Sequence, residues 1–312
     1  MWYTYNIGDA MKQVSKFLDY LKYEKGFSDY TIKSYKIDLC EFYDFCKDSE
    51  INIDIIRKYL KNLYELNYKN KTISRKISSL KSYFKYLESE NIIKENPMRL
   101  ISNPKIEKTL PNYLNYEDLE KLLAYPNIMS KYGLRDALIL EMLYSTGARV
   151  SELANMELKN INFAERKILI LGKGNKERFV YYGTKCEKLL NEYLKLDHKN
   201  SPYLLIGKNK EKLNEREIRQ IVTQTAKKAG LSVHVSPHTL RHTYATHMLN
   251  EGADLKSVGD LLGHENLSTT QIYTHISNER LRQVYLNAHP RAHKKEAIKW
   301  NMYTYLMKEI KV

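Results

Sequence analysis

A stretch near the C-terminal end of the sequence gathers side chains that can attack a phosphodiester without a metal ion. Residues 236–275 include two imidazoles, a guanidinium and a phenol near the expected ends of helices: His238, Arg241, His264 and Tyr273. A tyrosine hydroxyl can be a nucleophile, a guanidinium binds the nonbridging oxygens of a phosphate, and an imidazole moves protons or donates a hydrogen bond. The residue types therefore indicate chemistry at a phosphodiester.

The histidines of this stretch leave a zinc hydrolase open as an alternative. His238 and His242 have the i, i+4 spacing of two ligands on one helical face, and His247 could be a third. However, the sequence lacks a His-Glu-x-x-His motif, and Arg241 would crowd a cation. We therefore favour a site with no metal and no other cofactor, and zinc analysis of the purified protein distinguishes the two.

Two further motifs lie upstream. Residues 146–153 (TGARVSEL) place Arg149 in a tight turn, and residues 172–178 (GKGNKER) place Lys173 at the tip of an expected hairpin. Together with PHTLRH, LLGH and QIYTH, these motifs resemble the tyrosine recombinase (phage integrase) family, and most closely its Xer-type members. The resemblance extends over about residues 11–291.

The resemblance implies how the scissile phosphate is held. Arg149 and Arg241 would bind its nonbridging oxygens, and His264 would donate a third hydrogen bond. The trigonal-bipyramidal transition state carries extra negative charge, so these donors bind it better than the ground state.

The resemblance also implies the covalent steps. Tyr273 would be the nucleophile, His238 would accept its proton, and Lys173 would protonate the departing 5′ oxygen. The product would be a 3′-phosphotyrosyl link and a free 5′ hydroxyl. Attack by another strand's 5′ hydroxyl would reverse the chemistry and keep the energy of the phosphodiester, so neither ATP nor a metal is needed. Tyr181 and Tyr182 replace the proline and leucine that family members commonly have there, which leaves the assignment of Lys173 unchanged.

Related functions remain as alternatives. A type IB topoisomerase shares the chemistry, but the PHTLRH and LLGH motifs favour a recombinase. A catalytically inactive DNA-binding protein has no support, because every catalytic position is filled. The sequence lacks the extra N-terminal arm-binding domain of larger phage integrases. This favours Xer-type resolution of chromosome or plasmid dimers, and so a role in chromosome partition and cell division, over integration of a mobile element.

Hydrophobic periodicity predicts a mainly α-helical protein with a small β-hairpin or sheet (α+β). Four amphipathic helices are expected within residues 11–96, with Ser28, Asp54 and Thr72 at the starts of the last three. The second half should contain further helices and one hairpin: helices starting near residue 117 and at residue 151, helices over residues 133–145, 214–229 and 255–262, and strands 167–171 and 178–182. Thr239 should cap the helix of Arg241, and Ser268 should start that of Tyr273.

These elements predict a clamp on DNA built from two domains. The expected segments are a SAM-like helical core-binding domain (1–98), a linker (99–112), a catalytic domain (113–292) and a C-terminal extension (293–312). Family members exchange C-terminal segments between neighbours, so we expect the helix around residues 281–286 to pack in trans. Packing on its own core is the alternative.

The net charge of +14, from 51 Lys and Arg against 37 Asp and Glu, predicts a polyanionic partner. We expect double-stranded DNA, bound by a homotetramer or by a heterotetramer with a sister recombinase. The candidate DNA contacts on the fourth helix and the hairpin are Arg75, Lys76, Lys81, Lys176 and Arg178.

The sequence also predicts the compartment. Three cysteines without a CxxC motif argue against a disulfide framework or a zinc ribbon. No apolar run has the length of a signal peptide or a membrane span. We therefore expect a cytoplasmic protein.

Overall fold

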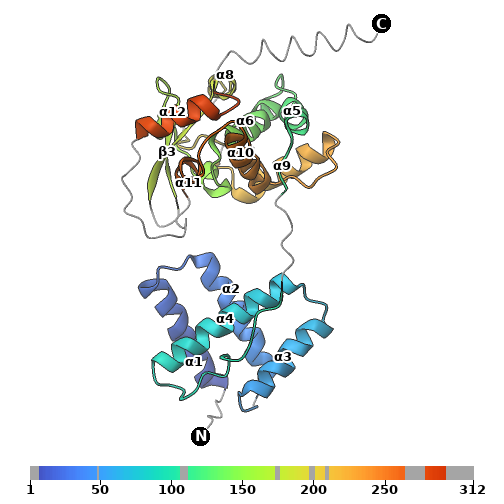
Figure 1. Cartoon of the computed structure of the whole chain (residues 1–312), viewed down its shortest axis with the longest axis vertical. Helices are drawn as coiled ribbons and strands as arrows, with labels where there is room; N and C mark the ends of the chain where they lie inside the picture. The colour runs from blue at the N-terminus through green and yellow to red at the C-terminus, as the bar shows by residue number, and fades with distance from the viewer. Residues whose placement is uncertain are drawn as a thin grey trace. The chain divides into compact units, whose positions relative to one another are not determined.

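The computed structural model describes residues 7–47, 49–105, 112–172, 176–196, 201–207, 211–263 and 278–292. Lys173, His264, Tyr273, the helix expected at Ser268 and the C-terminal extension lie outside the described residues. The chain divides into two compact units, Met1–Thr109 and Leu110–Val312 (Figure 1). The predicted fold class is confirmed, because the described residues are mainly helical with one small antiparallel sheet.

The described part of the first unit contains the four predicted helices: α1 (Ile7–Asp19), continued by a π-helical turn (Tyr20–Glu24), α2 (Asp29–Cys46), α3 (Ile53–Glu65) and α4 (Asn70–Ser89). Ser28 caps α2 as predicted, since its hydroxyl accepts a hydrogen bond from the Thr31 amide. Helix α3 begins at Ile53, one residue before the predicted Asp54, and Asn52 caps it. Helix α4 begins at Asn70, so the prediction that Thr72 caps it is wrong.

Aromatic rings fill the core of the first unit. Phe42 packs edge to face on Tyr59 and Phe84, with ring centroids 5.2 and 6.0 Å apart. Met98 and Ile101, beyond the end of α4, are buried against the same core. The chain is therefore packed on the first unit as far as Ile101, within the segment for which the sequence predicts a linker.

A buried ion-pair cluster joins α4 to α2 and encloses Lys76, one of the predicted DNA contacts. The Lys76 side chain is 2% exposed, and its ammonium contacts both Asp38, at 3.1 Å, and Glu41. Arg75 pairs with the same Asp38 carboxylate and keeps 43% of its side chain exposed. Periodicity within α4 could not reveal this burial, because the two acids come from α2. Lys76 therefore cannot reach a DNA phosphate in this conformation.

Lys76→Met should destabilise the first unit by about 3 kcal/mol, because it leaves part of the Asp38 charge buried without its partner. Urea-induced unfolding followed by circular dichroism measures the change. Lys85→Met is the matched control, since Lys85 is an exposed lysine of the same helix and should stay within about 0.5 kcal/mol of the wild type. Equal stability of the two variants would contradict the buried-cluster role.

The described ranges of the second unit contain, in chain order, α5 (Tyr116–Ala124), α6 (Lys131–Thr146), α7 (Val150–Ala154), a 3₁₀ turn (Leu158–Asn160), β1 (Ile161–Asn162), β2 (Lys167–Leu171), β3 (Glu177–Tyr181), α8 (Thr184–Leu194), α9 (Glu215–Lys228), α10 (Pro237–Asn250), α11 (Leu255–Leu262) and α12 (Asn278–Ala288). The predicted hairpin is confirmed, because β2 and β3 pair antiparallel with Leu169 opposite Phe179. The two-residue strand β1, which pairs with β2, was too short to be predicted.

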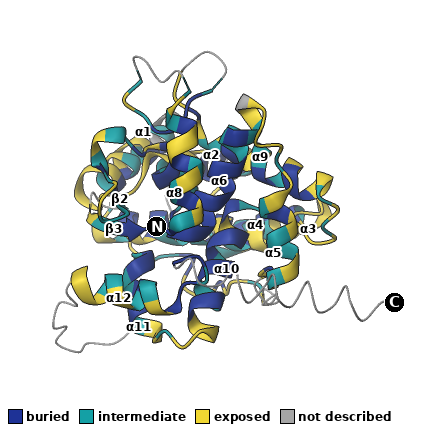
Figure 2. Ribbon diagram, turned by 90° about the horizontal axis from the view of Figure 1, so that it is seen from above, coloured by how far each residue is buried: buried dark blue, intermediate teal, exposed yellow. Residues whose placement is uncertain are grey.

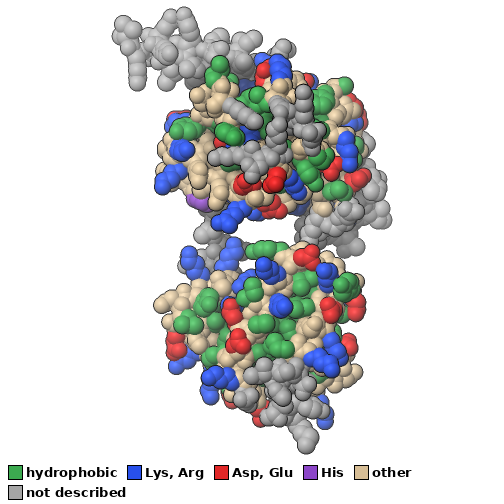
Figure 3. Space-filling model, turned by 180° about the vertical axis from the view of Figure 1, so that it is seen from behind, with side chains coloured by type: hydrophobic (Ala, Val, Ile, Leu, Met, Phe, Trp, Pro, Cys, Tyr) green, Lys and Arg blue, Asp and Glu red, His purple; other side chains and the backbone are tan. Residues whose placement is uncertain are grey.

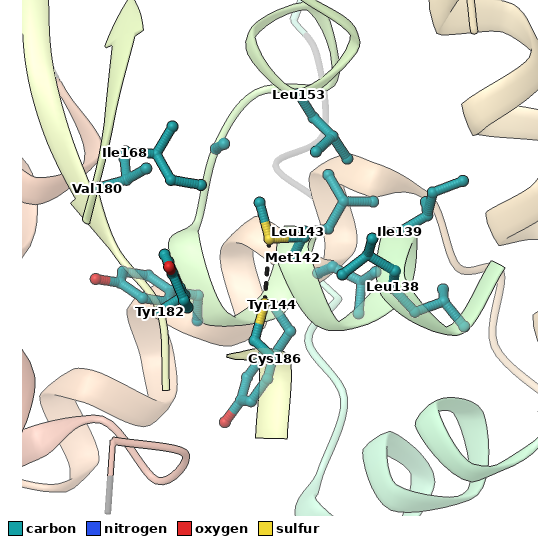
Figure 4. Packing of buried hydrophobic residues seen from close by; sticks show 14 of the residues in the cluster. Leu138, Ile139, Met142, Leu143, Tyr144, Leu153, Ile168, Val180, Tyr182 and Cys186 are labelled. Carbon is teal, nitrogen blue, oxygen red and sulfur yellow. Dashed lines mark hydrogen bonds between the residues drawn. The ribbon is translucent and has the colours of Figure 1, made fainter. Parts of the chain in front are cut away.

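Helix α6 is the centre of the second unit, and most of its length is buried (Figure 2). Met142 and Leu143 of α6, Leu153 of α7 and Ile168 of β2 meet in one hydrophobic cluster (Figure 4). Gly147 ends α6 in the left-handed conformation, with φ +60°. A Cβ there would lie 2.8 Å from the Leu262 side chain, so the turn that leads to Arg149 is fixed against α11.

Helix α12 packs on the core of its own chain in this structure. This is the alternative to the expected packing in trans on a neighbouring chain. Tyr285 and Ala288 are 1% and 5% exposed, and Leu281 and Val284 pack against the same core. Arg291, just beyond the helix, is buried and its guanidinium lies 2.6 Å from the Glu120 carboxylate. The apolar stripe was correctly predicted, but a stripe alone does not identify the chain on which it packs.

Candidate active site

The turn after α6 presents Arg149 as the sequence predicts. Arg149 precedes α7, which starts at Val150, one residue before the predicted position. Its backbone amide donates to Glu152 Oε2 at 2.7 Å, and Nη1 donates to Glu152 Oε1 at 2.9 Å. The remaining terminal nitrogen, Nη2, donates to the carbonyl of Gly263 at 3.0 Å. The guanidinium is thus anchored on two sides while a third of its side chain, 35%, stays exposed.

Arg241 projects from the first turns of α10, whose predicted start is wrong. Ser236 caps the helix rather than Thr239, because the Ser236 hydroxyl accepts from the Thr239 amide and the Thr239 hydroxyl accepts in return. Pro237 then occupies the first helical position, which needs no amide donor. His238 and Arg241 still lie near the start of a helix, as predicted, but the helix begins before both residues.

The Arg241 guanidinium is buried and held by backbone carbonyls. Nη1 and Nη2 each donate at 2.6 Å, to Gly147 and Leu262 respectively. Burial, and then the charge of Arg149, lowers the pKa of Arg241 to about 10. The group remains protonated at neutral pH, so the protein maintains a buried cation whose hydrogen bonds go to backbone carbonyls rather than to a carboxylate.

Arg149 and Arg241 converge on the C-terminal end of α11, where Leu262 and Gly263 hold one guanidinium each. The last carbonyls of a helix carry a partial negative charge and lack partners within the helix, so they suit cations. Because these carbonyls are neutral, they orient the arginines without neutralising them, and only Arg149 also pairs with a carboxylate, that of Glu152. Two guanidinium groups fixed in this way form a site for an anion with several oxygens, such as a phosphodiester.

Glu152 is a site residue that sequence reasoning missed. Burial acts to raise the pKa of its carboxyl, but the hydrogen bonds and charge of Arg178, and then the hydrogen bonds of Arg149, hold the pKa below its ordinary value. Glu152 accepts from both arginines and is 5% exposed. The spacing Arg-x-x-Glu at a helix start was the available signal, since the third helical position suits a carboxylate that accepts from the capping residue.

Arg178, predicted as a DNA contact, donates instead to protein acceptors. Nη1 and Nη2 donate to the two oxygens of Glu152 at 2.7 and 2.8 Å, and 13% of the side chain is exposed. Three guanidiniums, of Arg149, Arg178 and Arg241, thus surround one carboxylate, so three positive charges and one negative charge leave a balance of +2 within this group.

The other predicted contacts lie toward solvent. Lys176 is exposed before β3, and Lys81 is half-buried on α4. In the face of the first unit seen in Figure 3, Lys and Arg side chains lie scattered among hydrophobic and acidic ones rather than in one patch.

The histidines of α10 separate in the structure. His238 is exposed at the second position of the helix, whereas His247 is buried, with Nδ1 3.0 Å from the Tyr144 hydroxyl and its ring stacked on Tyr116. His247 therefore does not join His238 and His242 around one ion. Among the described residues, no three His, Cys, Asp or Glu side chains are grouped as metal ligands.

No helix in the described ranges is long and apolar enough to cross a membrane.

Comparison with known proteins identifies the class to which this fold and site belong. The phage integrase family matches residues 112–280, and the N-terminal SAM-like domain of phage integrases matches residues 14–91. The chain belongs to the phage integrase family and is a site-specific tyrosine recombinase. Its relatives include the tyrosine recombinase XerC of Staphylococcus haemolyticus, 44% identical over 89% of this chain and 97% of the relative, and XerC of Oceanobacillus iheyensis, 43% identical over 89% and 96%.

Solved structures agree with the fold. A pre-cleavage complex of the XerH recombinase with its difH substrate has a TM-score of 0.64, with 26% identity over 88% of this chain and 83% of that one. A lambda integrase dimer bound to a core site has a TM-score of 0.68, with 17% identity over 85% and 98%, which supports the fold alone. The predicted family, and the predicted similarity of this chain to Xer-type members, are confirmed.

Proposed function

We propose that this protein cuts and rejoins double-stranded DNA at specific sites through a 3′-phosphotyrosyl intermediate. The observation that carries the proposal is the convergence of Arg149 and Arg241 on the carbonyls of Gly147, Leu262 and Gly263. Both guanidiniums are oriented before DNA arrives, so little reorganisation is needed when negative charge develops on the phosphate. A site with this geometry favours the transition state over the bound substrate.

The remaining roles follow the order of the reaction. Tyr273 attacks the phosphorus, and His238, exposed at the start of α10, accepts the phenolic proton. Lys173 protonates the departing 5′ oxygen, and His264 donates to a nonbridging oxygen. Arg149 and Arg241 hold the phosphate throughout. His264 directly follows Gly263 in the chain, and Lys173 directly follows Gly172. These two glycines are described and lie against the Arg178 side chain.

The biological role we propose is Xer-type resolution of chromosome or plasmid dimers in the cytoplasm. XerC relatives that align over nearly their whole length support this role over integration of a mobile element. The active assembly is a tetramer on DNA, made of this chain alone or with a sister recombinase. Support comes from a solved lambda integrase tetramer bound to a Holliday junction, which has the same fold at 17% identity.

Covalent trapping on random duplexes tests the function. The wild-type protein should form adducts that survive denaturation, and sequencing the trapped DNA should yield one enriched site with inverted arms. EDTA should leave the yield of adduct unchanged. Trapped DNA without any enriched sequence, together with relaxation of supercoiled plasmid, would identify a type IB topoisomerase instead. Loss of the adduct on chelation would instead support the alternative hypothesis of a zinc-dependent enzyme.

A further inference from the structure

Arg178 uses every nitrogen of its guanidinium within the protein. Nη1 and Nη2 bind the two oxygens of Glu152, and Nε donates to the carbonyl of Leu261 at 3.2 Å. A bidentate arginine–carboxylate pair that is almost fully buried is strong and directional. A phosphate would have to displace Glu152 from this pair, which would leave a buried carboxylate uncompensated. Arg178 is therefore unsuited to the DNA contact that its sequence position suggests.

The Arg178 side chain also fills the space between two glycines. A Cβ on Gly172 would lie 3.2 Å from Arg178 Nη1, and a Cβ on Gly263 would lie 3.1 Å from the Arg178 side chain. Gly172 ends the first arm of the hairpin directly before Lys173, and Gly263 ends α11 directly before His264. One side chain thus touches the backbone just ahead of two proposed catalytic residues and, through Glu152, binds a third.

We propose that Arg178 is a positioning residue that joins three parts of the active site: Glu152 with Arg149, the hairpin of Lys173, and the end of α11 before His264. The three parts are Glu152 of α7, Gly172 directly after β2, and the end of α11 at Leu261 and Gly263, which are far apart in sequence. The proposal rests on the proposed function, because positioning has meaning only for that reaction.

The electrostatics define what loss of Arg178 does. Arg178 of β3 and Arg149, directly before α7, bind Glu152, and the charge of Glu152 also acts on Arg241 of α10. Without Arg178, burial raises the pKa of Glu152, and Arg149 becomes its remaining hydrogen-bond partner. The carboxylate then holds Arg149 alone, and protonation of Glu152 releases it. Cleavage by the variant should therefore fall as the pH drops through the raised pKa of Glu152, whereas in the wild type this carboxyl titrates below its ordinary range.

The test compares Arg178→Met and Arg178→Lys with the wild type on a duplex recovered by covalent trapping. Single-turnover cleavage should fall roughly 100-fold in both variants, the scale of a misplaced catalytic group. Noncovalent affinity and its salt dependence should not change, because no phosphate contact is lost. Arg166→Met is the control, because Arg166 lies in the same sheet region and pairs with Glu187 at 3.8 Å. This variant should cleave DNA at the wild-type rate.

The pH profile separates positioning from a general loss of structure. Relative to wild type, the acid limb of cleavage by Arg178→Met should move to higher pH. Adding Glu152→Gln to Arg178→Met should remove this displaced limb. Arg178→Lys keeps the charge and provides a folded variant if the methionine variant does not bind DNA.

Three results would overturn the proposal while wild-type adducts still form. They are wild-type cleavage by both Arg178 variants, a log–log salt slope that is shallower by about 0.9, as expected for one lost phosphate contact, or an unshifted acid limb. Absence of any adduct with the wild-type protein would instead refute the proposed function, so the two failures are distinct.

Discussion

Tyr273→Phe should abolish the covalent protein–DNA adduct and leave noncovalent binding to the same duplex unchanged. The substitution removes only the hydroxyl, which is the proposed nucleophile, while the guanidiniums of Arg149 and Arg241 still bind the phosphate. A labelled duplex on a denaturing gel measures the adduct, and a native gel measures binding. Full loss of the first with the second intact is the expected result.

Tyr285→Phe is the matched control, because Tyr285 is the next tyrosine along the chain. Its ring is 1% exposed and stacks on His289, with centroids 4.8 Å apart. Burial raises the pKa of Tyr285 well above its ordinary value, and its hydroxyl makes no hydrogen bond with the described residues. A buried phenol of this kind is a poor nucleophile, so this variant should form adducts normally. An adduct that survives in Tyr273→Phe and vanishes in the double variant would transfer the role to Tyr285.

Local signals in the sequence were sufficient for most of the helices and for the hairpin, whereas α8 (Thr184–Leu194) was not predicted. The period of 3.6 predicts α2, α6, α9 and α11, and alternation around a glycine-rich turn predicts the pairing of β2 with β3. Where two capping residues competed, the prediction failed. Thr239 and Thr72 both looked like caps, yet Ser236 caps α10, and α4 begins after Lys69. Local composition cannot rank caps that lie within one turn of each other.

The contacts that the sequence could not reveal are nonlocal. Lys76 has the spacing of a solvated residue, and only the acids of α2 explain its burial. Arg178 has the chemistry of a phosphate ligand, and only the approach of α7 and α11 explains why it faces Glu152. By contrast, the turn position of Arg149 and the nearness of Arg241 to a helix start were predictable. The roles of Lys173, His264 and Tyr273 stay predictions, because these residues lie outside the described ranges.

Lys173→Ala should lower the rate of cleavage by roughly 10²- to 10⁴-fold, the usual contribution of a general acid. The proposed role is to protonate the 5′ oxygen as it departs, because an alkoxide is a poor leaving group. A substrate with sulfur at this bridging position has a thiolate leaving group of much lower pKa, which needs no proton. The sulfur substrate should therefore restore cleavage by Lys173→Ala toward the wild-type rate on the same substrate.

Two further variants make the rescue specific. Arg149→Ala should stay impaired on the sulfur substrate, because its guanidinium is proposed to act on the nonbridging oxygens rather than the leaving group. Lys176→Ala tests the nearest alternative acid, since Lys176 is exposed at the turn end of the same hairpin, directly before β3. Single-turnover rates on the two substrates give the ratio for each variant. Only the residue that protonates the leaving group becomes dispensable when that group needs no proton. An equal defect of Lys173→Ala on both substrates, with rescue of Lys176→Ala on the sulfur substrate, would therefore assign the general acid to Lys176.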